Sequence, residues 1–423
     1  MKHNKISSFF ALSNLLLTII GYEFLAIVFL PAATPEMEGV DNAVLTQIYT
    51  IPFRALCLLV SLLTMLLNIR EKIQWTGKLK LLFFLIFLWI FRLVYDFYIR
   101  TDIDSGDNTK TQIFVAMAIL SLYSILKSYR RINFDLAYKY FCISLLVIIV
   151  AFAIKNPNLF ASSADLTNRM DASIGLSTLG LAAIGCFSML MLICWRRQYA
   201  LRGFFKLAWY LAFFLSLLIS LRSGSRGPLV AFMMVLMIYV FGRIKDKTVG
   251  LAVCGILVLF FYIFSDLFID LVGEISPVLK DRLTEKDEVN VVARQAMYKD
   301  AINGFMSNPL FGDCFGVRIN GTKSVFYPHN TILEAFNGLG LLGGLIYIYL
   351  INIAFVYTYR IVHSKIINEW MGLLLIFRII CSFFSGNFYS DGALISIWGI
   401  ILVMYESNRR NIKFNDKKIV LKN

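Results

Sequence analysis

One histidine stands out among the side chains of this sequence that could move a proton. His329 lies in the run Tyr-Pro-His-Asn, which closes the longest polar stretch of a very apolar chain. Imidazole is the one side chain whose unperturbed pKa lies near neutrality, so it can take or give a proton there. The other two histidines, His3 and His363, lie at the N-terminus and in a basic loop. His329 is therefore the candidate catalytic base.

Arg226 lies in a position that suits phosphate binding. Ser225 is a suitable N-cap and Pro228 is tolerated in a first helical turn, so a helix is expected to begin at Arg226. Free backbone N–H groups and the positive end of a helix dipole attract phosphate, and a guanidinium group adds a planar fork for its oxygens. Arg222 lies four residues earlier and could join the same site. The alternative is that these arginines bind lipid head groups at the membrane interface.

A second candidate arginine, Arg294, lies in a stretch with helical periodicity, residues 291–305. It falls within the face of this helix that is expected to pack, whose other members are Val291, Tyr298, Ala301, Ile302 and Phe305. An arginine in a packing face needs an anionic partner or a desolvated role. The structural alternative is an ion pair with Glu285, Asp287 or Glu288. Arg282 is a candidate of the same kind.

Two glycines follow the histidine motif at a characteristic spacing. Gly340 comes after Asn330 and nine intervening residues, and Gly343 follows at the start of an apolar helix, where both allow close backbone packing. The chain thus offers one possible base and several arginines, and no Cys/His cluster has metal-ligand spacing. Such a set suits an anionic, phosphate-bearing substrate, with arginines stabilising a leaving diphosphate as a metal does in other enzymes. We predict that no metal or cofactor takes part.

The elements that must position these residues are membrane helices. The chain has 423 residues, of which 58% are hydrophobic, and its mean hydropathy is +0.71. That much apolar area cannot be hidden inside a soluble globule, and solidly apolar segments do not fit the alternating pattern of a β-barrel. The sequence predicts an all-α polytopic membrane protein with about twelve spans. They lie near 9–30, 48–69, 79–99, 111–126, 134–154, 174–195, 204–221, 228–244, 248–272, 339–359, 369–384 and 388–405.

The loops between these spans alternate in charge. Loops rich in Lys and Arg alternate with acidic or neutral loops, and short basic loops stay cytoplasmic, so both termini are predicted inside. This rule explains much of the net charge of +14 without nucleic acid as a partner. The predicted order is spans one to nine in residues 1–272, a large outer loop with an amphipathic helix in 273–338, spans ten to twelve in 339–405, and a basic tail in 406–423. His329 is then the only histidine on the outer face.

Six charged residues fall in the outer half of predicted spans. Charges inside a span are costly and usually mark ion pairs or a polar cavity. Mutual pairing would explain them through helix packing, whereas their collection on one side favours a cavity open to the outside. The six are Glu23, Arg54, Arg92, Asp96, Asp266 and Arg378.

These motifs together resemble those of the O-antigen ligase and O-antigen polymerase superfamily of bacterial envelopes. The spacing from His329-Asn330 to Gly-Leu-Leu-Gly at 340–343 resembles the family signature, and Ser-Arg-Gly at 225–227 resembles its outer arginine motif. The segment with Arg294, followed by Asn-Pro-Leu-Phe-Gly at 308–312, resembles the part that precedes the histidine. The motifs occur in the family's order and cover roughly residues 220–345.

The resemblance implies a metal-independent, inverting glycosyltransferase of the GT-C type in the bacterial inner membrane. The donor is a glycan on undecaprenyl diphosphate, the acceptor is a second glycan, and the active site faces the periplasm. By carry-over, His329 would act as general base on the acceptor hydroxyl, and Arg226 and Arg294 would bind the diphosphate. Arg222 and Arg282 are further carry-overs for the diphosphate, with Asn330, Gly340 and Gly343 in support. The implied partners are membrane lipids and the chain-length regulator and flippase proteins of the same pathway.

The superfamily divides by acceptor. Ligases pass the glycan to lipid A core, whereas polymerases pass it to the next lipid-linked repeat unit. The forms Ser-Gly-Ser-Arg-Gly-Pro and Tyr-Pro-His-Asn look more like those of polymerases, because ligases often carry Thr-x-Thr-Arg and a further histidine where this chain has Tyr327. We favour the polymerase, with the ligase as the alternative. A lipid-linked oligosaccharide transporter is a second alternative, but its charges would lie nearer the bilayer midplane and its halves would show a repeat.

Overall fold

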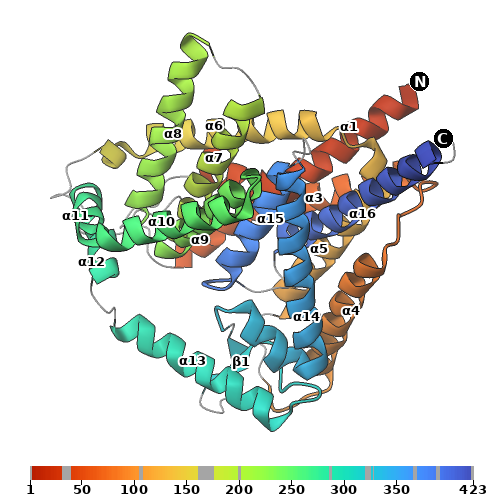
Figure 1. Cartoon of the computed structure of the whole chain (residues 1–423). Coiled ribbons are helices and arrows are strands. Elements are labelled where there is room, and N and C mark those ends of the chain that lie inside the picture. Colours follow the sequence, from red (N-terminus) through yellow and green to blue (C-terminus); the bar gives the residue numbers. More distant parts are fainter. Residues whose placement is uncertain are drawn as a thin grey trace. The chain divides into compact units, whose positions relative to one another are not determined.

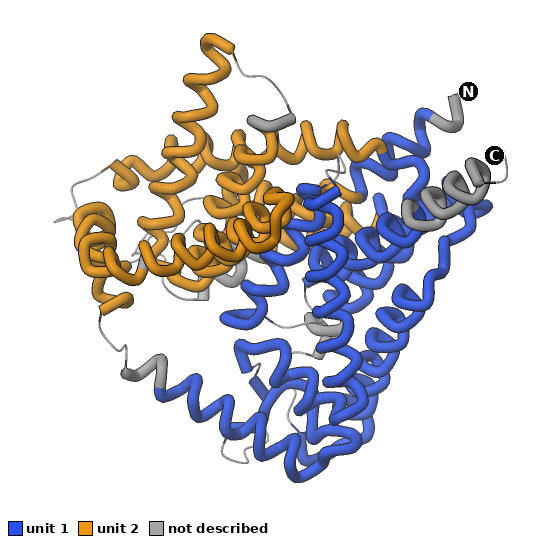
Figure 2. Tube along the Cα trace, in the orientation of Figure 1, with its two compact units in different colours: residues 1–14, 60–132, 289–423 blue, residues 15–59, 133–288 orange. Residues whose placement is uncertain are grey.

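The computed structural model describes residues 2–30, 40–103, 108–160, 176–198, 202–284, 288–319, 325–326, 328–364, 369–386 and 391–420. Within these residues the fold is helical, apart from one antiparallel pair of short strands, β1 (Val317–Arg318) and β2 (Val325–Phe326). The prediction of an all-α chain is therefore confirmed (Figure 1). The chain forms two compact units, coloured separately in Figure 2, and each is described by itself below.

Unit 1 comprises residues 1–14, 60–132 and 289–423. Three helices have residues in both units: α1 (Lys2–Leu16), α3 (Val40–Leu67) and α13 (Glu288–Ser307), of which only the first residue, Glu288, belongs to unit 2. The other helices of unit 1 are α4 (Gly77–Tyr98), α5 (Asn108–Ser128), the short 3-10 helix η3 (Tyr129–Arg131), α14 (Thr331–His363), α15 (Glu369–Ser382) and α16 (Gly392–Val420).

The centre of unit 1 is α15. Its side chains are apolar on every face, and every residue from Glu369 to Ile380 is buried except Arg378, which is partly buried. A helix that is hydrophobic all round is enclosed by protein or by lipid, and the burial of α15 shows that protein encloses it. Helices α14 and α16 pack against it and against each other (Figure 1).

Unit 2 comprises residues 15–59 and 133–288. Its core is formed by α7, which packs against α6, α8 and α9. The helices of this unit are the π-helical turn η1 (Leu17–Gly21), α2 (Tyr22–Val28), α6 (Phe134–Lys155), η4 (Pro157–Phe160), α7 (Thr178–Gln198), α8 (Phe204–Arg222), α9 (Arg226–Arg243), α10 (Lys247–Ile263), α11 (Ser265–Ile275) and α12 (Pro277–Thr284).

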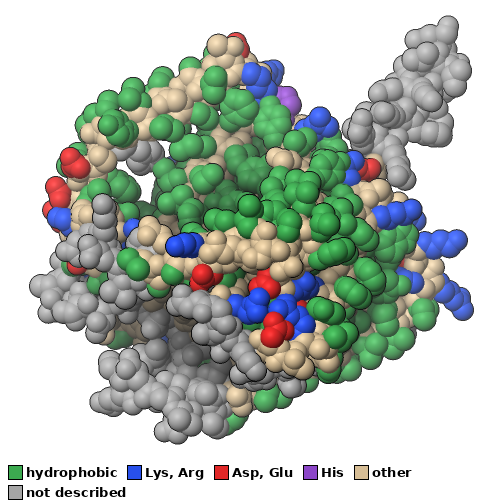
Figure 3. All heavy atoms as spheres, turned by 90° about the horizontal axis from the view of Figure 1, so that it is seen from below, with side chains coloured by type: hydrophobic (Ala, Val, Ile, Leu, Met, Phe, Trp, Pro, Cys, Tyr) green, Lys and Arg blue, Asp and Glu red, His purple; other side chains and the backbone are tan. Residues whose placement is uncertain are grey.

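The described helices indicate a multi-pass membrane protein. Nine of them are long and apolar enough to cross a membrane, or ten if the bent pair α10 and α11 forms one span. They correspond to predicted spans one to eight and ten, and hydrophobic side chains cover much of the surface seen in Figure 3. The predicted count of twelve is not confirmed. The 14 residues of α15 extend only about 21 Å, short of the ~30 Å hydrocarbon core, and the apolar part of α16 covers only Gly392–Ser407.

The predicted ninth span, 248–272, is bent. It consists of α10 and α11, whose axes differ by 64° at a break after Phe260. Asp266 lies in the first turn of α11, where a negative charge is stabilised by the helix dipole. This intramembrane charge is therefore explained by the start of a new helix.

The predicted tenth span also begins earlier than expected. Helix α14 starts at Thr331 and bends at Gly340, whose φ of 66° and ψ of −162° are non-helical. A Cβ atom at Gly340 would lie 2.3 Å from the carbonyl oxygen of Leu310. Only glycine combines this conformation with so close a backbone approach. Gly340 is thus the point where the segment after α13 packs against α14, as the prediction of close packing requires.

Candidate functional site

His329 ends the approach to α14 in a left-handed turn. Its φ is 55°, a conformation that histidine adopts more readily than most residues but that still carries strain. Asn330 follows as the N-cap, and its Oδ1 accepts hydrogen bonds from the backbone N–H groups of Ile332 and Leu333 at 3.0 and 3.1 Å. Asn330 therefore fixes the helix start beside His329, and its supporting role in the reaction stays a prediction. Tyr327 lies outside the described residues.

The end of α15 holds this helix start in position. Thr331 Oγ1 lies 2.9 Å from Ser382 Oγ, and the Tyr347 hydroxyl donates to Thr331 Oγ1 at 2.8 Å. His329 Nδ1 lies 3.4 Å from Ser385 Oγ, in the turn that follows α15. The imidazole is partly buried, and its ring is oriented by a residue 56 positions away in sequence. Because no local pattern links the two, the sequence prediction missed Ser385.

Arg294 acts on His329 through its charge. Burial of the imidazole and, second, the positive charge of Arg294 hold the pKa of His329 below its ordinary value. The two residues that the sequence singled out are therefore coupled within unit 1. Arg294 itself is exposed, so the prediction that it lies in a packed face of its helix is wrong. In α13 the packing is confined to the C-terminal half, where Ala301 is buried and Phe305 contacts Phe336.

The lowered pKa of His329 predicts the pH dependence of the reaction. A general base works unprotonated, so activity should appear as the pH rises through the pKa of His329 and the acidic limb of kcat/KM should lie below about 6.5. Replacing Arg294 with glutamine removes a positive charge and should move this limb to higher pH. Lys299→Gln, on the same helix, is the control and should leave the limb unchanged. Identical acidic limbs in the wild type and Arg294→Gln would contradict the coupling.

Three arginines meet at the turn between α8 and α9, and we call Arg222, Arg226 and Arg282 the arginine cluster. Helix α9 begins at Arg226 with Ser225 in the N-cap position, as predicted, but the Ser225 side chain makes no cap hydrogen bond. Arg226 is exposed and donates from Nη1 to the carbonyl oxygen of Arg282 at 2.7 Å. Arg282 in turn donates to the carbonyl oxygen of Gly224 at 3.3 Å. Arg226 and Arg282 are thus neighbours, and Arg222 lies buried in the last turn of α8, four residues before Arg226.

Apolar packing holds α12 beside this turn. Leu221 of α8, Val272 of α11 and Leu279 of α12 form a buried cluster, against which Leu217, Leu229 and Ile275 pack. The bond of Arg226 described above ends on a backbone carbonyl, which carries no net charge. Its guanidinium lies at the first turn of α9, where the helix dipole adds to the positive charge. This arrangement suits an anion such as a diphosphate.

The segment after α13 is fastened to both α4 and α14. The backbone N–H of Leu341 donates to the Pro309 carbonyl, and the N–H of Asp313 donates to the Asn337 carbonyl, each at 2.7 Å. Buried Asn337 also donates its side-chain amide to the carbonyls of Cys314 and Gly316. The run Asn-Pro-Leu-Phe-Gly at 308–312 is thus the structural partner of the Gly340 bend. Asn337 was missed in the sequence because an isolated polar residue in an apolar stretch carries no positional signal.

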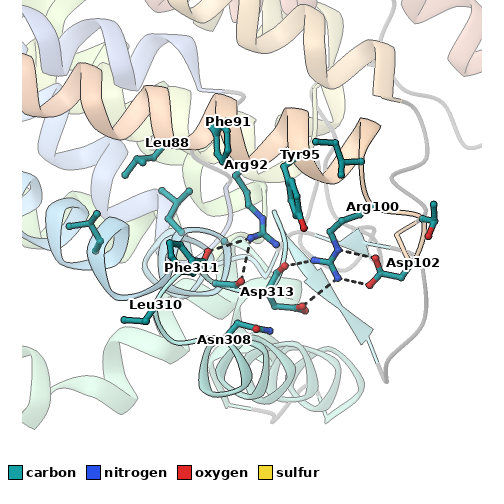
Figure 4. A pocket seen from close by; sticks show the side chains of 16 residues that line it. Leu88, Phe91, Arg92, Tyr95, Arg100, Asp102, Asn308, Leu310, Phe311 and Asp313 are labelled. Carbon is teal, nitrogen blue, oxygen red and sulfur yellow. Dashed lines mark hydrogen bonds and ion pairs between the residues drawn. The ribbon is translucent and has the colours of Figure 1, made fainter.

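Ion pairs account for several of the intramembrane charges. Arg92 and Asp96 form a buried pair at 2.8 Å, and Arg378 lies 3.3 Å from Asp391. Pairing, one of the two explanations offered by the sequence, therefore holds for Arg92, Asp96 and Arg378. Arg92 also donates to the carbonyls of Phe311 and Gly312 at 3.3 Å, as the dashed lines of Figure 4 show. Arg92 also lines a cavity, and the opening of a cavity to the outside stays a prediction.

The predicted site residues thus fall into two sets. His329, Asn330, Arg294, Gly340 and Gly343 belong to unit 1, and the arginine cluster belongs to unit 2. Among the described residues, no group of three or more His, Cys, Asp or Glu side chains is arranged to hold a metal ion. That the reaction needs no metal stays a prediction.

Comparison with known families agrees with the resemblance drawn from the motifs. Residues 211–348 match the model of a family described as O-antigen ligase. The matched range contains all of the predicted site residues, from Arg222 to Gly343. A search among curated proteins found no match to the chain. Residues 211–348 are therefore similar to the O-antigen ligase family, which supports the resemblance to the O-antigen ligase and O-antigen polymerase superfamily.

Proposed function

We propose that this chain is a membrane glycosyltransferase that polymerises O-antigen or a related surface polysaccharide. It would transfer a glycan from undecaprenyl diphosphate to the next lipid-linked repeat unit at the periplasmic face of the inner membrane. The observation that carries the proposal is that one family match, residues 211–348, contains both the arginine cluster and His329. A base and a set of phosphate-binding arginines are what transfer from a diphosphate-linked sugar requires.

The reaction would begin with proton transfer to His329. When Nδ1 donates to Ser385 Oγ, 3.4 Å away, the lone pair lies on Nε2. Nε2 would take the proton of the acceptor hydroxyl as the hydroxyl oxygen attacks the anomeric carbon of the donor. The lowered pKa of His329 keeps the imidazole unprotonated at neutral pH, ready to accept that proton. The imidazolium then returns the proton to water.

The arginines would act on the leaving group. The bond between the anomeric carbon and the diphosphate oxygen breaks on the face opposite the attack, so the configuration inverts. The electron pair leaves with undecaprenyl diphosphate, whose negative charge would be met by the arginine cluster and by Arg294. Guanidinium groups bind phosphate oxygens through paired hydrogen bonds and keep their charge at any accessible pH. This stabilisation would supply what a divalent cation supplies in other glycosyltransferases.

The ligase is the second candidate, because the matching family model is itself described as O-antigen ligase. A deletion of the gene in the bacterium that carries it separates the two, with lipopolysaccharide resolved on a gel. A polymerase deletion should leave lipid A core bearing a single repeat unit. A ligase deletion should leave bare core, with polymer accumulating on the lipid carrier. Unchanged polysaccharide in the deletion strain would reject both functions, and a plasmid copy of the gene should restore the wild-type pattern.

A further inference from the structure

A large groove in unit 1 lies apart from His329. Its volume is about 780 Å³, and it lies between the C-terminal half of α4, the segment 308–313 and residues 338–342 of α14 (Figure 4). All of its lining residues belong to unit 1. The mechanism proposed above uses none of them, so the groove needs its own explanation.

The lining changes in character along α4. Leu88 and Phe91, with Leu339 and Leu342 of α14, make one part of the wall apolar. Ten or so residues further along the chain, Arg100, Thr101 and Asp102 line it together with Asn308 and Asp313. Figure 4 shows this order, with Leu88 and Phe91 at one end and Arg100 and Asp102 at the other. A groove of this kind fits an amphiphile that has a hydrocarbon chain and a polar head.

The charges at the polar end largely cancel. Arg100 bonds to Asp102 and lies 3.7 Å from both Asp96 and Asp313, and Arg318 binds Asp313 at 2.6 Å and Asp102 at 3.0 Å. With the Arg92–Asp96 pair, three arginines face three aspartates. A balanced set of carboxylate oxygens and N–H donors suits the hydroxyl groups of a sugar.

The position of the groove along α14 distinguishes donor from acceptor. The first segment of α14, from Thr331 to Leu339, is about 13 Å long. His329 precedes the first residue of this segment, and the groove lies at its last residues. In the donor, the bond that breaks joins the sugar to the lipid diphosphate, so the donor's lipid end must lie at the catalytic base. In an acceptor repeat unit, the attacking hydroxyl is at the end of the glycan away from its lipid. A lipid site displaced from His329 by a helix of this length fits the acceptor.

We infer that the groove between α4 and α14 binds the lipid end of the acceptor, a polyprenyl-linked glycan. Leu88, Phe91 and Leu342 contact its hydrocarbon chain, and the polar end around Asp102 and Asn308 binds the sugar nearest the lipid. The inference rests on the proposed polymerase function. It adds to that function a second binding site, the groove, which would position the lipid of the acceptor.

Photocrosslinking at position 342 tests this directly. The crosslinking amino acid benzoylphenylalanine replaces Leu342 or, as a control, Leu345, which is equally exposed on the same helix but outside the groove. The protein is placed in phospholipid nanodiscs with undecaprenyl-diphosphate-linked repeat units extracted from the bacterium. We expect sugar-containing adducts at position 342 and not at 345. Equal adducts at both positions, or phospholipid adducts alone at position 342, would overturn the inference.

A kinetic variant distinguishes this inference from the proposed function. Leu342→Trp fills the groove and should raise the KM for lipid-linked repeat units about tenfold with little change in kcat, whereas Leu345→Trp should change neither. Crosslinking does not require turnover, so it can be repeated in the His329→Asn variant. If the gel rejects polymerisation but position 342 still captures the lipid-linked glycan, the proposed function fails and the binding site stands. If polymerisation holds but no such adduct forms, the groove assignment alone fails.

Discussion

Replacing His329 with asparagine should lower polymer formation roughly 10²–10⁴-fold, the usual contribution of a general base. Asparagine tolerates the left-handed conformation of this position, and its amide can still reach Ser385, so the helix start at Asn330 should persist. What it lacks is a group that accepts a proton near neutral pH. The rate is measured as polymer formed by purified protein from lipid-linked repeat units.

His363→Asn is the matched control for this prediction. His363 is exposed in the last turn of α14, where its ring stacks on Tyr359 at a centroid distance of 5.9 Å. Its replacement should leave polymer formation unchanged. Wild-type rates from a folded His329→Asn protein would remove the general base from the mechanism. A rate loss of the same size in both variants would point to a general effect on the protein instead.

The sequence predicted the long spans well because their signal is local. Stretches of about 20 apolar residues exceed what a soluble helix contains, and nine of the twelve predicted spans meet the length and composition tests in the structure. The prediction is not confirmed at the shorter helices. Helix α15 is apolar and is enclosed by its neighbours, and an apolar composition does not distinguish contact with protein from contact with lipid.

The bends at α10–α11 and in α14 show that the predicted spans did not use all the helix-start signals in the sequence. At the end of α10, Ser265 and Asp266 interrupt an apolar run, and an acidic residue in a first helical turn is a start signal that could have been used. At α14, Asn330 before an apolar run is also a start signal, yet the span was predicted to begin at 339, next to Gly340. Gly340 instead bends a helix that has already begun.

Those residues of the candidate site that lie at helix starts could be placed from the sequence. Arg226 begins α9, as its neighbours Ser225 and Pro228 indicate, and Asn330 caps α14. Periodicity could assign Arg294 to a face of α13 but could not tell that this end of the helix is uncovered. Partners such as Ser385, Asn337 and Asp313 depend on contacts between distant parts of the chain, which a single sequence does not record.

Replacing Arg226 with alanine should lower kcat/KM about 10²–10³-fold, the effect of removing one donor from a site that stabilises developing negative charge. Arg226 is exposed, and the bond described above ends on the backbone carbonyl of Arg282. Its removal should therefore change stability by about 0.5 kcal/mol or less, so the loss of activity can be assigned to the diphosphate. Arg226→Lys keeps the charge but lacks the planar fork, and its activity should lie between those of the wild type and Arg226→Ala.

Two further variants make this result specific. Arg243→Ala removes a positive charge from the opposite end of the same helix, where the guanidinium lies over the Tyr239 ring, and should leave kcat/KM near the wild-type value. Arg282→Ala removes a second guanidinium and its bond to the Gly224 carbonyl, while the carbonyl that accepts from Arg226 remains, and it should also lower kcat/KM. Both rates are measured with the assay used for His329, beside thermal unfolding of each purified variant. Near-normal kcat/KM in folded Arg226→Ala would mean that the leaving diphosphate is not stabilised at the first turn of α9.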